Sequence, residues 1–389
     1  MSDVPHLRFP EFSGEWEETT LGKISEITKG SGISKDQLSE QGSPCILYGE
    51  LYTKYNSEVI GVVYSRTELE SSSLVKSKAN DVIIPCSGET AIDISTARCV
   101  PFNNILLGGD LNIIRLKHDD GGFFAYQLNG ARKKDIARVA QGVSVVHLYG
   151  ENLKHIRVYH PVIEEQKKIT RLLSLIDERI ATQNKIIEDL KKLKSAIIEI
   201  EYTPNTKTTS HIGDVIEQIS KRNKNNAIQN VLSVSNRQGF IKQSDQFENR
   251  NVASEDTSNY KIVEQNDFAF NPARINVGSI ARLTTFEKGI VSPMYICFRA
   301  QENVAPEYID SFFESKHFYC EIQKRLEGSV RQCLSFEGLC NIPLSLPSFE
   351  MQQLIGKRLF TLGQKIKTET YLLELLNKQK QYLLRQMFI

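Results

Sequence analysis

Three charged residues in the C-terminal half, Asp310, Glu314 and Lys316, are of the types that a metal-dependent nuclease uses. The carboxylates would hold a divalent cation, and the lysine would stabilise charge that develops on the phosphate. The two acids are four residues apart in a stretch predicted to be helical, so they share one helix face. The strand-to-strand spacing of a restriction-nuclease core is absent. This pattern favours a solvated helix face over a metal site.

Residues 271–274 (Asn-Pro-Ala-Arg) begin like the Asn-Pro-Pro-aromatic motif of adenine methyltransferases. They lack the second proline and the aromatic ring that would stack on a flipped base. No glycine-rich loop follows a strand to hold S-adenosylmethionine, and no GxSxG or HExxH motif is present. We therefore expect no catalytic residue, metal or cofactor in this chain. A self-sufficient methyltransferase or nuclease is the enzyme alternative.

Composition is that of an ordinary globular protein of two or three domains, with 389 residues, 40% hydrophobic and 24% charged. The seven cysteines form no CxxC pair, which predicts buried, reduced thiols without zinc. No secretory signal and no run of about 20 apolar residues is present, so we expect a cytoplasmic protein without a membrane partner. The net charge of +1 excludes a wholly basic surface but allows segregated basic clefts.

A duplication organises the chain. Residues 142–176 return as residues 328–362 at a constant offset of 186, and residues 21–28 match residues 212–219 at an offset of 191. The segments between these blocks share little sequence. A common frame with different variable parts predicts two similar domains that carry two different binding surfaces. Identical pairs in the frame are Asn80/Asn266, Gly142/Gly328, Leu148/Leu334, Glu151/Glu337, Leu153/Leu339, Ile156/Ile342, Pro161/Pro347, Gln166/Gln352 and Ile169/Ile355.

Short apolar runs bounded by glycine, proline and asparagine predict strands in both halves. A helical pattern follows in each half, over residues 123–139 and 307–326, and ends in basic residues that suit a helix C-terminus or a phosphate equally well. The predicted strands are residues 59–64, 81–84, 105–107 and 111–116 in the first half, and 231–234, 268–270, 279–283 and 290–298 in the second.

Two long helices follow the two domains. Residues 165–200 contain no proline or glycine, and their apolar residues recur with a period of 3.5, typical of a coiled-coil seam. A helix of this length spans roughly 50 Å. Two such helices pair most simply with each other, antiparallel; the alternative is that each packs on its own domain. The predicted seam residues are Ile169, Leu173, Ile176, Ile180, Ile187, Leu190 and Ile197, and Ile355, Leu359, Leu362, Ile366, Leu373, Leu376 and Leu383, with Gln183, Lys194, Glu369 and Lys380 in polar slots.

The two-part layout, with the pattern G…L…L…I…P…EQ..I before each long helix, resembles the specificity subunit (HsdS) of type I restriction–modification systems. The opening LRFPEFSGEWEETTLGKISEIT is similar to that family's N-terminal signature. The first copy keeps the family's Glu-Gln as Glu165-Gln166, whereas the second has Met351-Gln352. The resemblance covers essentially the full length, and the duplicated frame is its specific part.

The resemblance implies an α+β fold in which two globular α/β target recognition domains are separated by two long antiparallel coiled-coil helices, as a pseudo-two-fold internal repeat. Together the domains would read a bipartite, asymmetric target in double-stranded DNA. The helices would dock two modification (HsdM) subunits, which carry S-adenosylmethionine, and restriction (HsdR) subunits would add ATP- and Mg-dependent functions. The expected segments are recognition domain 1 (1–160), helix 1 (161–203), recognition domain 2 (204–346) and helix 2 (347–389).

Candidate DNA-reading residues come from polar loops at equivalent positions in both halves. Arg and Lys suit guanine, Asn and Gln suit adenine, and Lys, Arg, Ser, Thr and backbone amides suit phosphates. A coiled-coil scaffold that joins two protein-binding domains is the alternative outside DNA binding. The predicted DNA-binding residues are Gly30, Ser31, Lys35, Tyr48, Glu50, Tyr52, Lys54, Ser87 and Thr90 in the first half, and Lys221, Arg222, Lys224, Asn225, Arg237, Asn271, Arg274 and Asn276 in the second.

Overall fold

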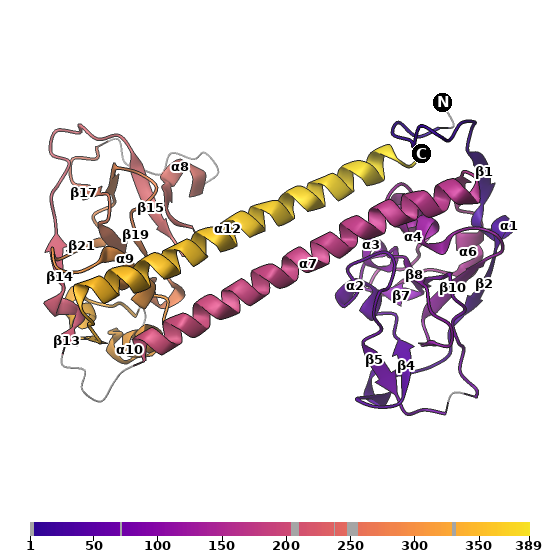
Figure 1. The fold of residues 1–389 in the computed structure, drawn as a ribbon, viewed down its shortest axis with the longest axis horizontal. Coiled ribbons are helices and arrows are strands. Elements are labelled where there is room, and N and C mark those ends of the chain that lie inside the picture. Colours follow the sequence, from indigo (N-terminus) through magenta and orange to yellow (C-terminus); the bar gives the residue numbers. More distant parts are fainter. Residues whose placement is uncertain (1–3, 71, 204–209, 237, 247–255, 329–331) are drawn as a thin grey trace. The chain divides into compact units, whose positions relative to one another are not determined.

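The computed structural model describes residues 4–70, 72–203, 210–236, 238–246, 256–328 and 332–389. The chain divides into two compact units: unit 1 comprises residues 1–184 and 371–389, and unit 2 comprises residues 185–370. The long helices α7 (Ile163–Tyr202) and α12 (Phe349–Gln386) begin shortly after Pro161 and Pro347 (Figure 1). Each unit therefore holds one globular domain and parts of both helices, whereas the sequence-based segments treat the helices as separate.

The domain of unit 1 contains a four-stranded antiparallel sheet of order β2-β10-β6-β8 and a second sheet of order β3-β5-β4-β9, in which β4 and β9 are parallel. Its elements before α7 are β1 (Glu17–Thr20), α1 (Leu21–Ile24), β2 (Ser25–Lys29), η1 (Lys35–Gln37), β3 (Leu38–Ser39), β4 (Ser43–Ile46), α2 (Glu50–Thr53), β5 (Ser65–Thr67), β6 (Asp81–Pro85), β7 (Ser87–Gly88), α3 (Ala91–Ile94), β8 (Arg98–Val100), β9 (Leu106–Leu107), β10 (Leu111–Leu116), α4 (Gly121–Asn129), α5 (Lys133–Val139), β11 (Val146–His147), α6 (Gly150–Lys154) and β12 (Arg157–His160).

The domain of unit 2 repeats this plan, with an antiparallel sheet of order β14-β21-β18-β19 and a second sheet of order β16-β15-β20-β17, in which β15 and β20 are parallel. Its elements between α7 and α12 are β13 (Ser210–His211), η2 (Ile212–Asp214), β14 (Ile216–Ile219), β15 (Val231–Ser235), β16 (Gly239–Lys242), α8 (Gln243–Gln246), β17 (Lys261–Glu264), β18 (Phe268–Phe270), η3 (Ile275–Val277), β19 (Ile280–Arg282), β20 (Lys288–Val291), β21 (Ile296–Ala300), α9 (Pro306–Phe312), α10 (Lys316–Arg325), α11 (Phe336–Cys340) and β22 (Pro343–Leu344).

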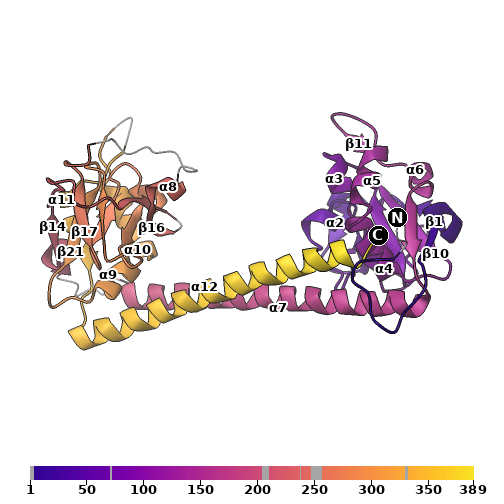
Figure 2. The same ribbon diagram turned by 90° about the horizontal axis from the view of Figure 1, so that it is seen from above.

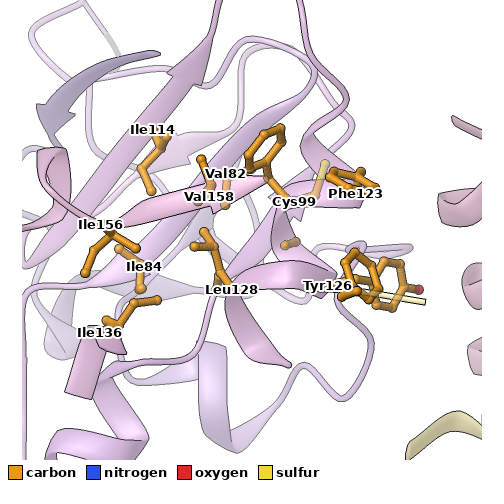
Figure 3. Packing of buried hydrophobic residues seen from close by; sticks show 14 of the residues in the cluster. Val82, Ile84, Cys99, Ile114, Phe123, Tyr126, Leu128, Ile136, Ile156 and Val158 are labelled. Atoms are coloured by element: carbon orange, nitrogen blue, oxygen red, sulfur yellow. The ribbon is translucent and has the colours of Figure 1, made fainter. Parts of the chain in front are cut away.

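The central strands β6 and β18 are mostly apolar because both faces of each antiparallel sheet are covered. Val82 and Ile84 of β6 belong to the core that contains Phe123 and Tyr126 (Figure 3). Ile83, which lies between them in the strand, belongs to a second core. In unit 2, Phe268 and Phe270 of β18 face the corresponding core, and Ala269 faces the other. The period of two along one strand therefore builds two cores at once.

Several sequence-based element predictions were wrong. Residues 59–64 form no strand: Ile60 is buried and donates its N–H to the Cys99 carbonyl, but Val62 and Tyr64 are exposed. The run 290–298 is two strands in different sheets, separated by a turn at Ser292 to Tyr295.

Both predicted domain helices are also split. Asn129 ends α4 because its side chain bonds the Ala97 backbone through both Nδ2 and Oδ1, at 2.9 and 2.8 Å. In unit 2 the helix is interrupted between Phe312 and Lys316. The Ser315 side chain accepts a hydrogen bond from the Phe318 N–H and caps α10.

The seven cysteines are free, but the prediction that all of them are buried was wrong. Burial raises the pKa of the Cys45 and Cys86 thiols to about 11. Cys320 is exposed on α10, because its helix covers the core with the opposite face, which carries Phe318 and Ile322.

The identical glutamines of the frame fix the start of each long helix. Gln166 accepts a hydrogen bond from the Asp120 N–H at 2.9 Å and donates to the Pro161 carbonyl at 2.9 Å. Gln352 likewise accepts from the Ala305 N–H at 3.1 Å and donates to the Pro347 carbonyl at 2.9 Å. Both side chains are buried, so each joins the first turn of its long helix to the N-terminus of a domain helix, α4 or α9.

The Glu165/Met351 difference between the copies has a local cause. Arg8 forms a bidentate ion pair with Glu165, with Nε–Oε1 and Nη2–Oε2 distances of 2.8 and 2.7 Å. Glu165 is fully buried in this pair, whereas Met351 is 47% exposed. Glu165 therefore binds the N-terminal segment of unit 1 through Arg8. Among the described contacts, no equivalent ion pair occurs in unit 2.

Opposite ends of the two long helices meet within each unit, so they run antiparallel. In unit 1, Leu383 lies in the same core as Ile169 and Leu173. In unit 2, Ile198 and Tyr202 share a core with Ile355 and Leu359. The starts of the helices also pack on their own domains, so both packing alternatives hold in part.

All predicted seam residues are buried or half-buried. The buried ones are Ile169, Leu173, Ile176, Ile187, Ile355, Leu359, Leu376 and Leu383, and the half-buried ones are Ile180, Leu190, Ile197, Leu362, Ile366 and Leu373. Near the end of α7 the neighbouring Ile198 is more deeply buried than Ile197, because this turn faces the domain core as well as α12.

Candidate nucleic-acid interface

Strand direction collects the variable loops at one edge of each antiparallel sheet. β2 and β6 both run antiparallel to β10, which lies between them, so their C-terminal ends lie at the same edge. In unit 2, β14 and β18 flank β21 in the same way. We call this the recognition edge; the loops that leave it are residues 30–35 and 86–90 in unit 1, and 220–225 and 271–276 in unit 2.

A hollow of about 830 Å³ lies beside the recognition edge of unit 1. The predicted residues Lys35, Tyr48, Tyr52 and Lys54 line it, together with Asp110. Two loops that are distant in sequence meet there because β9 joins both: the Ser31 N–H donates to the Leu107 carbonyl, and the Gly108 N–H donates to the Ile46 carbonyl.

The Tyr52 hydroxyl is suited to donate a hydrogen bond. Burial, then the neighbouring Tyr48, Asp93 and Glu89, raise its pKa above the ordinary value, so it keeps its proton at neutral pH. A Cβ on Gly88 would lie 3.7 Å from this hydroxyl, which places Tyr52 beside the segment 87–90. The three loops predicted for unit 1 are therefore neighbours.

Other predicted residues of unit 1 support the loops. Glu50 is buried; its carboxylate accepts from the Leu47 N–H at 3.0 Å, from Lys54 Nζ at 2.6 Å and from the Ser65 hydroxyl. Ser87 is buried in β7. Both side chains are buried, and their assignment to DNA contact stays a prediction.

Gly30, Ser31 and Thr90 also have structural contacts. A Cβ on Gly30 would lie 2.0 Å from the Gly108 carbonyl oxygen, so only glycine fits there. The Ser31 hydroxyl accepts from the Val75 N–H, and the exposed Thr90 caps α3 by accepting from the Asp93 N–H. Lys35, Tyr48, Tyr52 and Lys54 remain the predicted side chains that face the hollow.

The corresponding hollow of unit 2, about 860 Å³, is basic. The predicted residues Lys221, Arg222, Lys224 and Asn225 line it together, and no Asp or Glu is among the described residues of its lining. Sequence reasoning missed Lys288, which lines the same hollow from the start of β20 and pairs with Glu264 at 2.9 Å. Its position next to the loop depends on strand pairing, which no sequence motif reveals.

The second loop at the edge of unit 2 contains Asn271, Arg274 and Asn276. Asn271 is buried, and its Oδ1 accepts from the Ala273 N–H at 3.0 Å, so it shapes the turn; its role in base reading stays a prediction. Arg274 is exposed and Asn276 is half-buried. Arg237 lies outside the described residues. A Cβ on Gly278 would lie 3.7 Å from the Asn236 Cβ, so this loop neighbours the turn after β15.

A further loop at each recognition edge was not predicted. The Leu148 N–H donates to the Cys86 carbonyl at 2.7 Å, and the Leu334 N–H donates to the Pro272 carbonyl at 3.0 Å. In unit 1, Leu148 follows a turn that begins with Gly142, which has a φ of 117°; the duplicated glycine of unit 2, Gly328, has a φ of 106°. The identical glycines were the sequence signal, but a pattern alone does not show that the turn reaches the edge.

The residues considered for nuclease chemistry form ion pairs instead. Arg282 contacts Asp310 at 3.2 Å and also pairs with Glu307, while Lys194 contacts Glu314 at 2.7 Å. Within the described ranges no cluster of three or more His, Cys, Asp or Glu residues fits a metal ion. No helix in the part of the chain that the structure describes is long and apolar enough to cross a bilayer.

Two domains built on one frame, each with a different loop cluster at the same sheet edge, define a protein of the two-part recognition class. A family model described as the type I restriction modification DNA specificity domain matches residues 13–192. This match places residues 13–192 among the DNA specificity domains of type I restriction–modification systems.

Similar proteins agree with this placement. The putative type I restriction enzyme MjaX specificity subunit of Methanocaldococcus jannaschii is 24% identical over 66% of this chain and 65% of its own length. The MjaVIII specificity subunit of the same organism is 22% identical over 96% of this chain and 91% of its own length. In fold, the S subunit of a type I restriction–modification system from M. genitalium matches with a TM-score of 0.67 at 17% identity, over 99% of both chains. A further solved structure, from work on assembly and conformational transition of the type I system, matches with a TM-score of 0.51 at 14% identity, over 96% of this chain and 97% of the other.

Proposed function

We propose that the chain reads a bipartite, asymmetric target in double-stranded DNA, one half-site with each unit. The supporting observation is that the same sheet edge in both units collects polar loops whose sequences differ, while the frame beneath them is duplicated. Different readers on equivalent frames suit two different half-sites, in contrast to the palindromes that symmetric dimers bind.

The two hollows are suited to different parts of this task. In unit 1, Tyr48 and Tyr52 provide aromatic faces and hydroxyls, and Lys35 and Lys54 provide charge. In unit 2, Lys221, Arg222, Lys224 and Lys288 concentrate four cations around one hollow. Lysine and arginine side chains bind phosphates in any sequence. Of these four, Lys288 also pairs with Glu264, and Arg222 donates to Asn259 Oδ1 at 3.1 Å. We infer that the hollow of unit 2 contributes mainly to affinity, while Arg274 and Asn276, which lie outside it, and Arg237 are the candidates of this unit for base reading.

The proposed complex takes its catalysis from other chains. The expected partners are two modification subunits, which would carry S-adenosylmethionine for adenine methylation, and restriction subunits, which would use ATP and Mg²⁺. The chain itself is proposed to be non-catalytic and free of cofactors. The pairing of Asp310 and Glu314 with Arg282 and Lys194 supports this, because their carboxylates already have cationic partners.

The long helices offer a surface on which such partners would dock. Large apolar side chains stand exposed on them outside the seam, although isolated exposed apolar residues are common. A series of them along two long helices is typical of an interaction face. These residues are Leu175, Ile186, Leu193 and Ile200 on α7, and Tyr371, Leu375 and Tyr382 on α12.

The experiment is reconstitution of the chain with its methyltransferase partner, followed by methylation of a random-sequence DNA library in the presence of S-adenosylmethionine. We expect modified adenines in one asymmetric bipartite sequence, and no methylation by either component alone. Methylation without sequence preference would contradict the recognition role. Activity of the isolated chain with S-adenosylmethionine or Mg²⁺ would favour the enzyme alternative.

A further inference from the structure

The turn at residues 142–145 of unit 1, which we call the valine tip, exposes apolar side chains to an unusual degree. Val143 is 96% exposed and Val145 is 54% exposed. Because an exposed branched aliphatic side chain gains nothing in the free protein, the tip is a candidate contact surface. The equivalent positions of unit 2, 329–331, have the sequence Ser-Val-Arg and lie outside the described residues.

The valine tip is held in one conformation. Gln141 and His147 exchange two backbone hydrogen bonds of 2.9 and 2.7 Å across its base. Gly142 has a φ of +117°, and a Cβ there would lie 2.1 Å from the Val145 carbonyl oxygen, so no other residue fits this turn. The valines are therefore presented outward by an ordered turn.

The position of the tip indicates what it contacts. β11, which follows the tip, pairs with β7 next to the end of β6, so the tip stands at the recognition edge. In Figure 2 the loop at β11 lies on the side of unit 1 away from α7. Its flanks carry groups suited to nucleic acid: the Arg138 side chain pairs with Asp135 at 3.0 Å but is 76% exposed, and the rings of His147 and Tyr149 stack with centroids 6.2 Å apart.

We propose that the valine tip contacts the 5-methyl group of a thymine in the half-site that unit 1 reads. This rests on the proposed DNA recognition and adds a specificity-determining contact to it. Valine has no polar side-chain atom with which to bond a phosphate or a base edge. In the major groove only thymine presents an apolar group, its 5-methyl, so an apolar tip among polar loops selects thymine.

Deoxyuridine tests this directly, because it pairs like thymine but lacks the methyl group. Once the target is known, each thymine in it is replaced singly by deoxyuridine, and initial methylation rates at subsaturating DNA are measured with the reconstituted complex. We expect that one thymine, in one half-site, is sensitive. Its replacement lowers the methylation rate about fourfold, because burying one methyl group contributes about 0.8 kcal/mol. In the Val143→Ala or Val145→Ala variant, the ratio of the methylation rates on thymine and deoxyuridine DNA falls toward one.

Val62→Ala is the matched control, since Val62 is a 59% exposed valine of unit 1 before β5, and it keeps the full discrimination. Equal thermal unfolding of the variants shows that they fold. The proposal is overturned if no single thymine is sensitive, if the target has no thymine, or if the alanine variants discriminate like the original chain. A complex that shows no sequence preference at all would instead contradict the proposed recognition function, so the two failures are distinguishable.

Discussion

Replacing Lys380 by methionine tests how the polar slots of the seam stabilise unit 1. Lys380 Nζ lies 2.6 Å from both Glu58 Oε2 and Asp177 Oδ1, and the three side chains are only 13, 9 and 6% exposed. Two buried carboxylates thus share one ammonium. Removing one partner of a buried ion pair leaves uncompensated charge, which costs about 3–5 kcal/mol.

The pH dependence of this loss has a definite sign. Burial, and then the Glu58 charge, raise the pKa of Asp177 to about 6. For Glu58, burial acts to raise the pKa, but the Lys380 charge outweighs it and holds the pKa below its ordinary value. A carboxyl whose pKa is higher in the folded state stabilises that state at low pH and loses this effect as pH rises. In Lys380→Met both carboxylates lack the ammonium, so the destabilisation is greatest near pH 8 and smaller near pH 5.

Trp16 makes the assay specific for unit 1. It is the single tryptophan of the chain and is buried in the same core as Phe123 and Phe388, whose rings it contacts. Urea unfolding followed by its fluorescence reports this core separately from unit 2, which matters because a chain of two units need not unfold in one step. The expected result is a lower midpoint for Lys380→Met, with the larger shift at pH 8.

Lys154→Met is the matched control within unit 1, since Lys154 pairs with Glu151 at the surface and its loss leaves the midpoint unchanged. Adding Glu58→Gln and Asp177→Asn to Lys380→Met should recover part of the stability by removing the uncompensated charges. A free energy of unfolding for Lys380→Met within 1 kcal/mol of the original chain at pH 8, or a pH trend of the opposite sign, would refute the reasoning.

Three further predictions concern the frame, the basic hollow and the helix surface. Gln352→Met leaves the Ala305 N–H and the Pro347 carbonyl unpaired; it should destabilise unit 2 by about 2 kcal/mol by circular dichroism, without moving the Trp16 transition. Lys221→Ala should lower DNA affinity for all sequences alike and reduce the slope of log K against log salt by about 1, with unchanged target preference in a methylation library. Leu193→Asp should weaken co-purification with the modification partner while leaving the unfolding midpoint intact, because Leu193 is 51% exposed; equal co-purification would contradict docking at this face.

The frame could be predicted from the sequence because its identical residues have identical tasks. Leu148 and Leu334 donate to equivalent carbonyls, and Gln166 and Gln352 make equivalent pairs of hydrogen bonds. One ion pair that occurs in both units was not predicted from the sequence. Arg115–Asp81 and Arg299–Asp267 are both bidentate, but their partners are 34 and 32 residues apart, so no constant offset relates them.

The candidate site was less predictable, because the same residue types build loops and bind ligands. Glu50 and Asn271 have the polarity of base readers, yet they satisfy backbone N–H groups within their own turns. Short polar side chains commonly do this in loops, and only burial distinguishes the two uses. Lys288 shows the converse: it lies far along the chain from residues 220–225 and joins their hollow through strand pairing alone.

The residues of the duplicated frame and the residues of the loops differ in how freely they can be substituted. Gln166 and Gln352 make buried hydrogen bonds to backbone groups, and Leu148 and Leu334 are fully buried. Gly142 and Gly328 have positive φ values that favour glycine. The exposed loop side chains at the recognition edge are not constrained in this way. Substitutions there alter what is bound without unfolding the domain, since surface changes cost little stability. A frame of this kind therefore allows one unit to acquire a new half-site while the other keeps its own.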